Sequence, residues 1–110
     1  EATTAMRTAR LKVATKARLT PAGPCAKGDI LAVAGGVTIV VGEDVLATVI
    51  DACRRMLEVG GEQITLLVEG ELIADITAEA VQDGLPKHRR VDVAVYPADN
   101  LGSLVEIGVE

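Results

Sequence analysis

Only a few side chains of this sequence have the chemistry of a catalytic or ligand-binding group. His88, the single histidine, stands in the basic stretch "PKHRR". A histidine can act as a general base, but a lone imidazole in an exposed basic segment is more often simply solvated. The neighbouring Lys87, Arg89 and Arg90 either hold an anion or form ordinary surface. We therefore expect no catalytic role for this segment.

Four carboxylates follow the apolar run of residues 63–68, and they are Glu69, Glu71, Asp75 and Glu79. Loops after the carboxyl ends of strands often hold binding sites in α/β sheets. This acidic segment could therefore hold a cation or meet a basic partner. It has no recognisable metal-binding spacing and no histidine accompanies it. A solvated acidic loop is the simpler interpretation, and we predict no metal site here.

The cysteine thiols and the Ser103 hydroxyl are no stronger candidates for catalytic or metal-binding groups. Cys25 and Cys53 form no CxxC pair, and with one histidine they do not supply the four ligands of a structural zinc site. We interpret both as reduced, small hydrophobic residues, with Cys53 on the apolar side of an expected helix. Ser103 has no His and Asp context to activate it. Because phosphate-binding glycine motifs are also missing from the sequence, we predict no catalytic residue and no cofactor in this chain.

Composition and charge favour one globular domain and exclude several classes of protein. The chain has 110 residues, 49% of them apolar, with no Phe or Trp and one Tyr. It therefore lacks the aromatic surface on which nucleic-acid bases stack. Its net charge of −5 would repel phosphate backbones. No apolar run is long enough to span a bilayer and no signal peptide is visible, so we expect a cytoplasmic protein without nucleic-acid partners.

The first expected element is a strand over residues 9–19. Apolar and small residues alternate there with Arg10, Lys12, Lys16 and Arg18, which is the period of a half-buried strand with one basic face. A basic face of this kind is a docking surface for an acidic partner, a solvated outer face, or an edge strand protected by charge. The sequence leaves these three interpretations open.

The remaining pattern alternates strands and helices. Prolines and glycines predict a loop over residues 20–29, and a Gly-Gly turn predicts a hairpin of strands 30–34 and 37–41, at least one of them covered on both faces. Helical spacing predicts a helix over 43–58 that ends at Gly60 and Gly61. Strands are expected at 63–68, 91–96 and 104–110, with a short helix at 78–83 capped by Thr77.

These elements predict an α/β fold that borders on α+β. The strand, helix and strand between residues 63 and 96 form a βαβ unit and imply a parallel pair. We therefore predict a single domain over residues 1–110, built on a mixed sheet of five to six strands with two helices. Because the chain opens on Glu1 rather than Met, we expect it to be a piece of a longer protein rather than a processed chain.

Several stretches, in their order and spacing, resemble a bacterial family. They are "MRTARLKVATKA" (residues 6–17), "AKGDILAVAGGVTIVVGEDV" (26–45), "MLEVGGEQITLLVEGEL" (56–72), "VDVAVYPADN" (91–100) and "EIGVE" (106–110). Together they cover nearly the whole chain and are similar to the C-terminal region of fatty acid kinase A-like proteins. These proteins are also described as dihydroxyacetone-kinase-related or Dak-phosphatase-like.

The resemblance implies a non-catalytic module of an ATP-dependent kinase. In this family the kinase phosphorylates the carboxylate of a fatty acid held by a separate DegV-like binding protein, and the C-terminal region, part of a DegV-type fold, engages that carrier. ATP and Mg²⁺ are expected in an N-terminal domain outside this chain. The partners implied are the DegV-like carrier and the rest of the same chain, with a homodimer of the full-length protein left open. Our candidate carrier contacts are Arg7, Arg10, Lys12, Glu69, Glu71 and Leu72.

One segment departs from the family pattern. Residues 96–110 read "YPADNLGSLVEIGVE", where relatives usually carry a Gly-Gly-Gln turn and a second aromatic residue. If that turn shapes the partner surface, docking differs in this chain. Two alternative functions stay open, namely a lipid- or small-molecule-binding domain and a structural or oligomerising domain.

Overall fold

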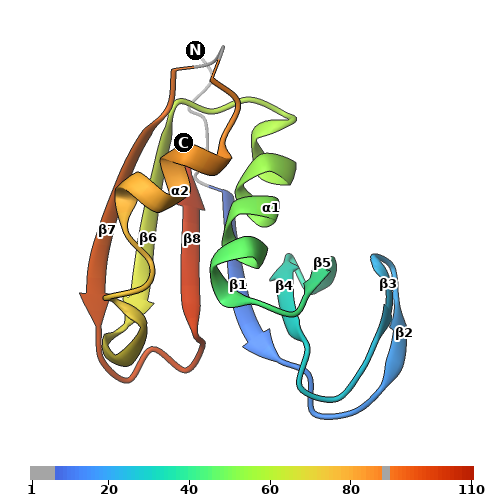
Figure 1. The fold of residues 1–110 in the computed structure, drawn as a ribbon. Coiled ribbons are helices and arrows are strands. Elements are labelled where there is room, and N and C mark those ends of the chain that lie inside the picture. The colour runs from blue at the N-terminus through green and yellow to red at the C-terminus, as the bar shows by residue number, and fades with distance from the viewer. Residues whose placement is uncertain (1–6, 88–89) are drawn as a thin grey trace.

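The computed structural model describes residues 7–87 and 90–110. These residues form a six-stranded sheet, a separate two-stranded ribbon and two α-helices (Figure 1). The strands are β1 (Arg7–Val13), β2 (Arg18–Thr20), β3 (Gly23–Cys25), β4 (Ile30–Ala34), β5 (Val37–Gly42), β6 (Gln63–Glu69), β7 (Asp92–Ala98) and β8 (Val105–Val109). The helices are α1 (Val45–Leu57), the 3-10 turn η1 (Gly70–Leu72) and α2 (Ala78–Gly84).

The large sheet is mixed, as the sequence predicted. Its strand order is β5-β4-β1-β8-β6-β7. β6 and β7 run parallel, and the other pairs in the sheet are antiparallel. α2 lies between β6 and β7 in the chain, which confirms the βαβ unit. The predicted α/β fold with two helices is therefore confirmed.

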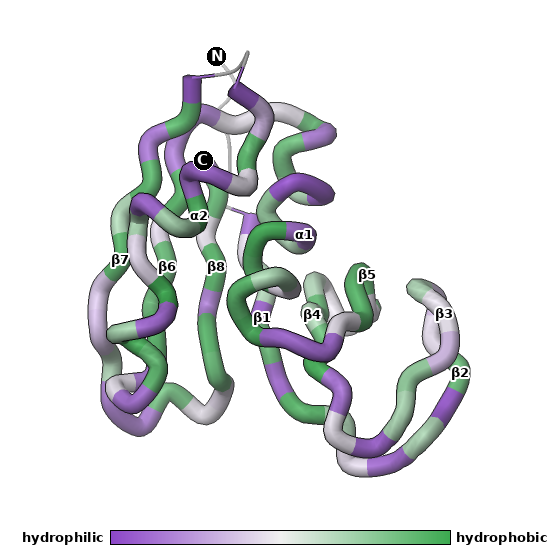
Figure 2. The backbone as a smooth tube through the Cα atoms, viewed as in Figure 1, coloured by the Kyte–Doolittle hydropathy of each residue, from purple (hydrophilic) through white to green (hydrophobic). Residues whose placement is uncertain are grey.

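Both α-helices lie on one face of this sheet (Figure 1). That face carries the main core, because alternate residues of each strand point toward the helices. Leu11, Leu66 and Ile107 are at most 1% exposed and come from three neighbouring strands. In Figure 2, β8 is mostly hydrophobic, and hydrophilic residues gather at both ends of the sheet. The aliphatic residues thus fill one layer between the helices and one face of the sheet.

The opposite face of the sheet has no α-helix over it within the described residues, and we call it the open face. Its strand residues include Arg10, Lys12, Leu67, Tyr96 and Glu106. Antiparallel sheets commonly have one face packed on the core and one in contact with water. The open face is therefore the natural place to look for a partner.

α1 begins two residues later and ends one residue earlier than the helix predicted over residues 43–58. Asp44 caps it, because its Oδ2 accepts a hydrogen bond of 2.9 Å from the backbone N–H of Ala47. Thr48, which is fully buried, donates from Oγ1 to the Asp44 carbonyl at 2.7 Å. After the helix, Gly60 and Gly61 take φ angles of +106° and +139°. The predicted glycine stop is confirmed, with positive φ at both glycines.

The prediction of one strand over residues 9–19 is wrong. β1 ends at Val13 because Ala14 turns to pair with another segment: its N–H donates to Asp29 at 2.8 Å and its carbonyl accepts from Gly28 at 2.9 Å. The chain then bends and forms β2 in a different sheet. β1 also lies between β4 and β8, which excludes the interpretation of its basic face as a protected edge.

The segment predicted as a loop contains β3, which pairs with β2 as the ribbon. The ribbon lies beside β5, at the edge of the large sheet (Figure 1). Its Cys25 packs with Ala14 and Leu31 in a second small cluster. Leu31 and its neighbours Ile30 and Ala32 are all buried, so β4 is covered on both faces, as predicted. Among the described residues, neither helix is both long and apolar enough to cross a membrane.

Candidate functional site

A single row of side chains crosses the open face of the sheet. The strand registers pair Val33 with Arg10, Arg10 with Glu106, Glu106 with Leu67, and Leu67 with Tyr96. Residues directly opposite one another on neighbouring strands point to the same face and touch. The row therefore spans five strands, from β4 through β1, β8 and β6 to β7.

The row combines an apolar end with a charged centre. Tyr96, the only aromatic residue of the chain, is 53% exposed, and Leu67 beside it is half-buried. In the centre, Arg10 Nη2 lies 3.4 Å from Glu106 Oε2. Tyrosine and arginine are both residue types enriched at protein interfaces, and this row presents one of each, with Glu106 and Leu67 between them. The row therefore offers contact area and charge.

Beside the row, the loop of residues 99–104 forms a corner with the ends of β1 and β6. Two adjoining depressions meet there, one of about 310 Å³ lined by Arg10 and Lys12 and one of about 340 Å³ lined by Lys12 and Glu69. Gly102 and Ser103 line both. We call this region the corner. The structure thus brings together Arg10, Lys12 and Glu69, which the sequence had placed in two separate groups.

The corner is held by backbone contacts between the loop and the strands. Glu69 accepts a hydrogen bond from the Leu101 N–H at 3.4 Å, and its own N–H donates to the Leu104 carbonyl at 3.1 Å. The Leu104 N–H donates to Leu11 at 2.9 Å. Asn100 has a φ of +57°, a conformation that asparagine tolerates better than most residues.

Two of the predicted contacts have structural roles instead. Arg7 is half-buried and lies on the helix side of β1, where its guanidinium donates to the carbonyls of Met56, at 2.7 Å, and Gly60. It therefore caps the end of α1 and does not share a face with Arg10 and Lys12. Leu72 is half-buried and packs against the main core. We leave both out of the proposed contact set.

The other predicted polar residues lie scattered. Glu71 is exposed on η1, close in sequence to the corner but not among the residues that line it. His88 and Arg89 lie outside the described residues. Across residues 7–87 and 90–110, no three His, Cys, Asp or Glu side chains gather as a metal site would require. What the described residues assemble is a surface for contact.

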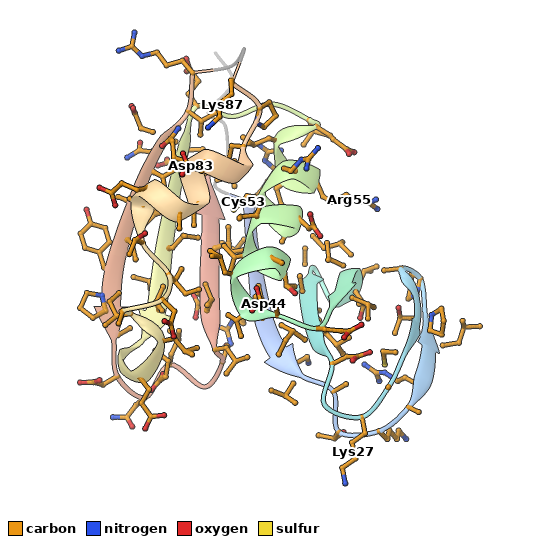
Figure 3. The ribbon with its side chains drawn as sticks, viewed as in Figure 1. Lys27, Asp44, Cys53, Arg55, Asp83 and Lys87 are labelled. Carbon is orange, nitrogen blue, oxygen red and sulfur yellow. The ribbon has the colours of Figure 1, made fainter. Side chains whose placement is uncertain are left out.

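Both cysteines are free and buried, as predicted for small hydrophobic residues. Cys25 donates weakly from Sγ to the Lys16 carbonyl at 3.8 Å. Cys53, fully buried on the inner side of α1 (Figure 3), has no solvent to stabilise a thiolate. Burial raises the pKa of its thiol from 9.0 to about 12. Neither thiol is therefore placed to act as a nucleophile.

This shift in the pKa of Cys53 predicts a pH dependence of stability. Between pH 9.0, where the thiol of the unfolded chain ionises, and about pH 12, the unfolded state binds fewer protons than the folded state. The neutral thiol therefore contributes its full stabilisation below pH 9.0, and this contribution to the free energy of unfolding is lost as pH rises through this window. We expect the free energy of unfolding to fall more steeply between about pH 8 and pH 10.5 for the wild type than for Cys53→Ala, as urea titrations would measure. Parallel pH profiles of the two proteins would contradict this account.

Sequence patterns alone did not single out Leu67 and Tyr96. A signal was available, because the buried residues Ile64, Leu66 and Val68 alternate and leave Leu67 on the other face. The parallel register to β7, which puts Tyr96 beside it, depends on the tertiary fold.

Comparison with known protein families assigns the chain. A search of curated proteins found no match. A family model for the C-terminal domain of fatty acid kinase A-like proteins matches residues 1–110, which is the whole chain. The chain belongs to the family of fatty acid kinase A-like C-terminal domains.

Proposed function

We propose that this domain is a non-catalytic module of a fatty acid kinase, and that it engages a DegV-like protein carrying the fatty acid. The observation that carries the proposal is the open face, whose row of Arg10, Glu106, Leu67 and Tyr96 ends beside the corner. The family membership supports the connection to a kinase. ATP and Mg²⁺ would then be bound elsewhere in the kinase, in an N-terminal domain of the same protein.

The physical case for docking rests on what a sheet face of this kind can supply. Leu67 and Tyr96 provide apolar contact area, while Arg10 and Lys12 are exposed cations at its border. Protein interfaces combine apolar contact area with charged and polar residues in this way. Charges at the rim mainly set the association rate and orientation. Such a face suits a carrier that must bind, present its fatty acid and leave.

Charge reversal on the open face tests the proposal in the full-length kinase. We expect Arg10→Glu together with Lys12→Glu to raise the KM for the loaded carrier about tenfold, because two attractive charges become repulsive. The KM for ATP and the kcat should stay unchanged, since the domain supplies no catalytic group. Steady-state acyl phosphate formation at varied carrier concentration would measure the KM for the carrier and the kcat. Initial rates at varied ATP concentration would measure the KM for ATP.

A matched control separates this effect from a general change in charge. Arg54 on α1 and Arg90 before β7 are both exposed and line neither depression of the corner. Arg54→Glu with Arg90→Glu changes the net charge by the same amount and should leave the KM for the carrier near that of the wild type. Equal increases in KM for the two double variants would contradict docking of the carrier on the open face.

A second candidate function, binding of a small apolar ligand, is favoured by one further depression. It has a volume of about 550 Å³ and lies at the end of α1, with Ile39, Met56 and Val59 in its lining and Arg55 at its border. That volume is within the range of small-molecule sites, and Val59 is 78% exposed. Purified domain would then carry a fatty acid in native mass spectrometry, and added fatty acid would raise its Tm. Absence of both effects would leave carrier docking as the single proposal.

A further inference from the structure

The ribbon of β2 and β3 exposes the most accessible large hydrophobic side chain among the described residues. Leu19 is 82% exposed. Its cross-strand partner in the ribbon is Pro24, which is exposed as well. Pro21 and Ala22 in the connecting turn are also exposed. The outer face and the tip of the ribbon are therefore apolar and open to solvent.

The ribbon is held rigidly at its tip and at its base. At the tip, Thr20 Oγ1 donates to the Gly23 carbonyl at 2.6 Å and accepts from the Ala22 N–H at 3.1 Å. At the base, Asp29 Oδ2 accepts from the Ala26 N–H at 2.8 Å. An isolated two-stranded hairpin is marginally stable, so these contacts fix a conformation that would otherwise fray. An ordered arm loses little conformational entropy when it binds.

The charge around the ribbon differs in sign from the charge of the chain. Residues 15–28, which contain the ribbon, hold three basic residues, Lys16, Arg18 and Lys27, and no acidic one, although the whole chain carries a net charge of −5. Beside the tip, a depression that Pro21 and Ala22 line also holds two carboxylates and two guanidinium groups, so it adds no net charge. Arg18 lies within the ribbon, and Lys27 at its base points away from the body (Figure 3). In Figure 2, hydrophobic and hydrophilic residues stand side by side along this arm. An acidic surface is its electrostatic complement.

Single exposed hydrophobic residues are common on protein surfaces, but Leu19 differs in its setting. It stands on a preorganised arm, beside an exposed proline, within a segment of one charge sign. An anionic membrane would also attract such a segment. However, the ribbon has no aromatic residue of the kind that anchors proteins at the membrane interface. The observations therefore favour a protein partner.

We propose that the ribbon is a docking arm, and that Leu19 enters an apolar pocket rimmed by carboxylates on the fatty acid carrier. This inference rests on the proposed function and adds a second contact to the open face. β1 connects the two, because Lys12 and Val13 line the corner and the chain then bends directly into β2. One carrier would be held at the corner and by the arm. Two separate weak contacts to one partner reinforce each other when their geometry allows both.

Calorimetric titration of the DegV-like carrier from the same organism tests the arm. Burial of a leucine side chain predicts that Leu19→Ser weakens the Kd about tenfold or more. Val37→Ser on β5 is the control, since Val37 is also exposed, at 48%, and lines none of the depressions described above. Arg18→Glu with Lys27→Glu should weaken binding and flatten its salt dependence. Lys87→Glu with Arg90→Glu, at two exposed positions before β7, should do neither. All variants change exposed side chains, and unchanged Tm values would verify that they fold.

The outcomes separate the arm from the proposed function. Binding by the wild type that Leu19→Ser weakens and Val37→Ser does not would support the arm. Equal binding by the wild type and Leu19→Ser would overturn the arm and leave the proposed function standing. No binding by the folded wild type would overturn both. If Leu19→Ser lost binding only to vesicles of phosphatidylcholine and phosphatidylglycerol, with carrier binding intact, a membrane would replace the protein partner.

Discussion

Replacing Leu66 by alanine is expected to lower the free energy of unfolding by about 2–5 kcal/mol. Leu66 lies on β6, is fully buried, and points from the middle of the sheet into the layer between strands and helices. Its neighbours across the ladder, Ile107 on β8 and Val95 on β7, are fixed in their strands and cannot close the cavity. Urea denaturation followed by circular dichroism would measure the loss.

Leu67→Ala is the matched control for this change. It removes the same atoms from the next residue of the same strand, but Leu67 is half-buried on the open face. We expect a loss of about 1 kcal/mol or less, since water already reaches this side chain. Equal losses for the two variants would show that the open face is covered in solution. The same variant should weaken carrier binding if the open face docks the carrier.

Gly61→Ala is the second change with a large expected effect. Gly61 has a φ of +139°, a backbone conformation that residues with a Cβ rarely adopt. An added Cβ would lie 2.6 Å from Val109 Cγ1 and 3.1 Å from Arg7 Nη2. Backbone strain of about 1–3 kcal/mol and crowding of similar size predict a total loss of about 2–5 kcal/mol. Thermal and urea denaturation would measure it.

Gly60→Ala separates the two causes. Gly60 also has a positive φ, +106°, but an added Cβ there would meet no atom within 4 Å. It should therefore lose only the backbone contribution, about 1–3 kcal/mol. If Gly61→Ala were no more destabilising than Gly60→Ala, the packing of β8 against this turn would be looser than the structure indicates.

The regular part of the fold follows from local patterns in the sequence. The helix after Asp44, the glycine stop and the hairpin of β4 and β5 were all predictable, because capping, helical spacing and a Gly-Gly turn act over a few residues. The βαβ unit was predictable for the same reason. The end of β1 at Ala14 was not predictable, because it depends on hydrogen bonds between Ala14 and Gly28 and Asp29, which follow the ribbon in the chain.

The candidate site was predictable only in its charged residues. Arg10, Lys12 and Glu69 were recognised from their types, yet their meeting at one corner depends on strand order. The sequence pattern also did not reveal that Arg7, three residues from Arg10 and therefore on the opposite face of β1, caps α1. The exposure of Leu19 was missed because β2 pairs with β3, a segment rich in proline and glycine that the sequence predicted as a loop. No local pattern indicates that pairing.

Docking of a fatty acid carrier, without any contribution to catalysis, is the central role proposed for this domain. Titration of the wild-type domain with the DegV-like carrier, loaded with fatty acid and empty in parallel, tests it most directly. We predict saturable heats with the loaded carrier and no ATP hydrolysis by the isolated domain. Absence of any binding heat from a domain that unfolds cooperatively would contradict this role.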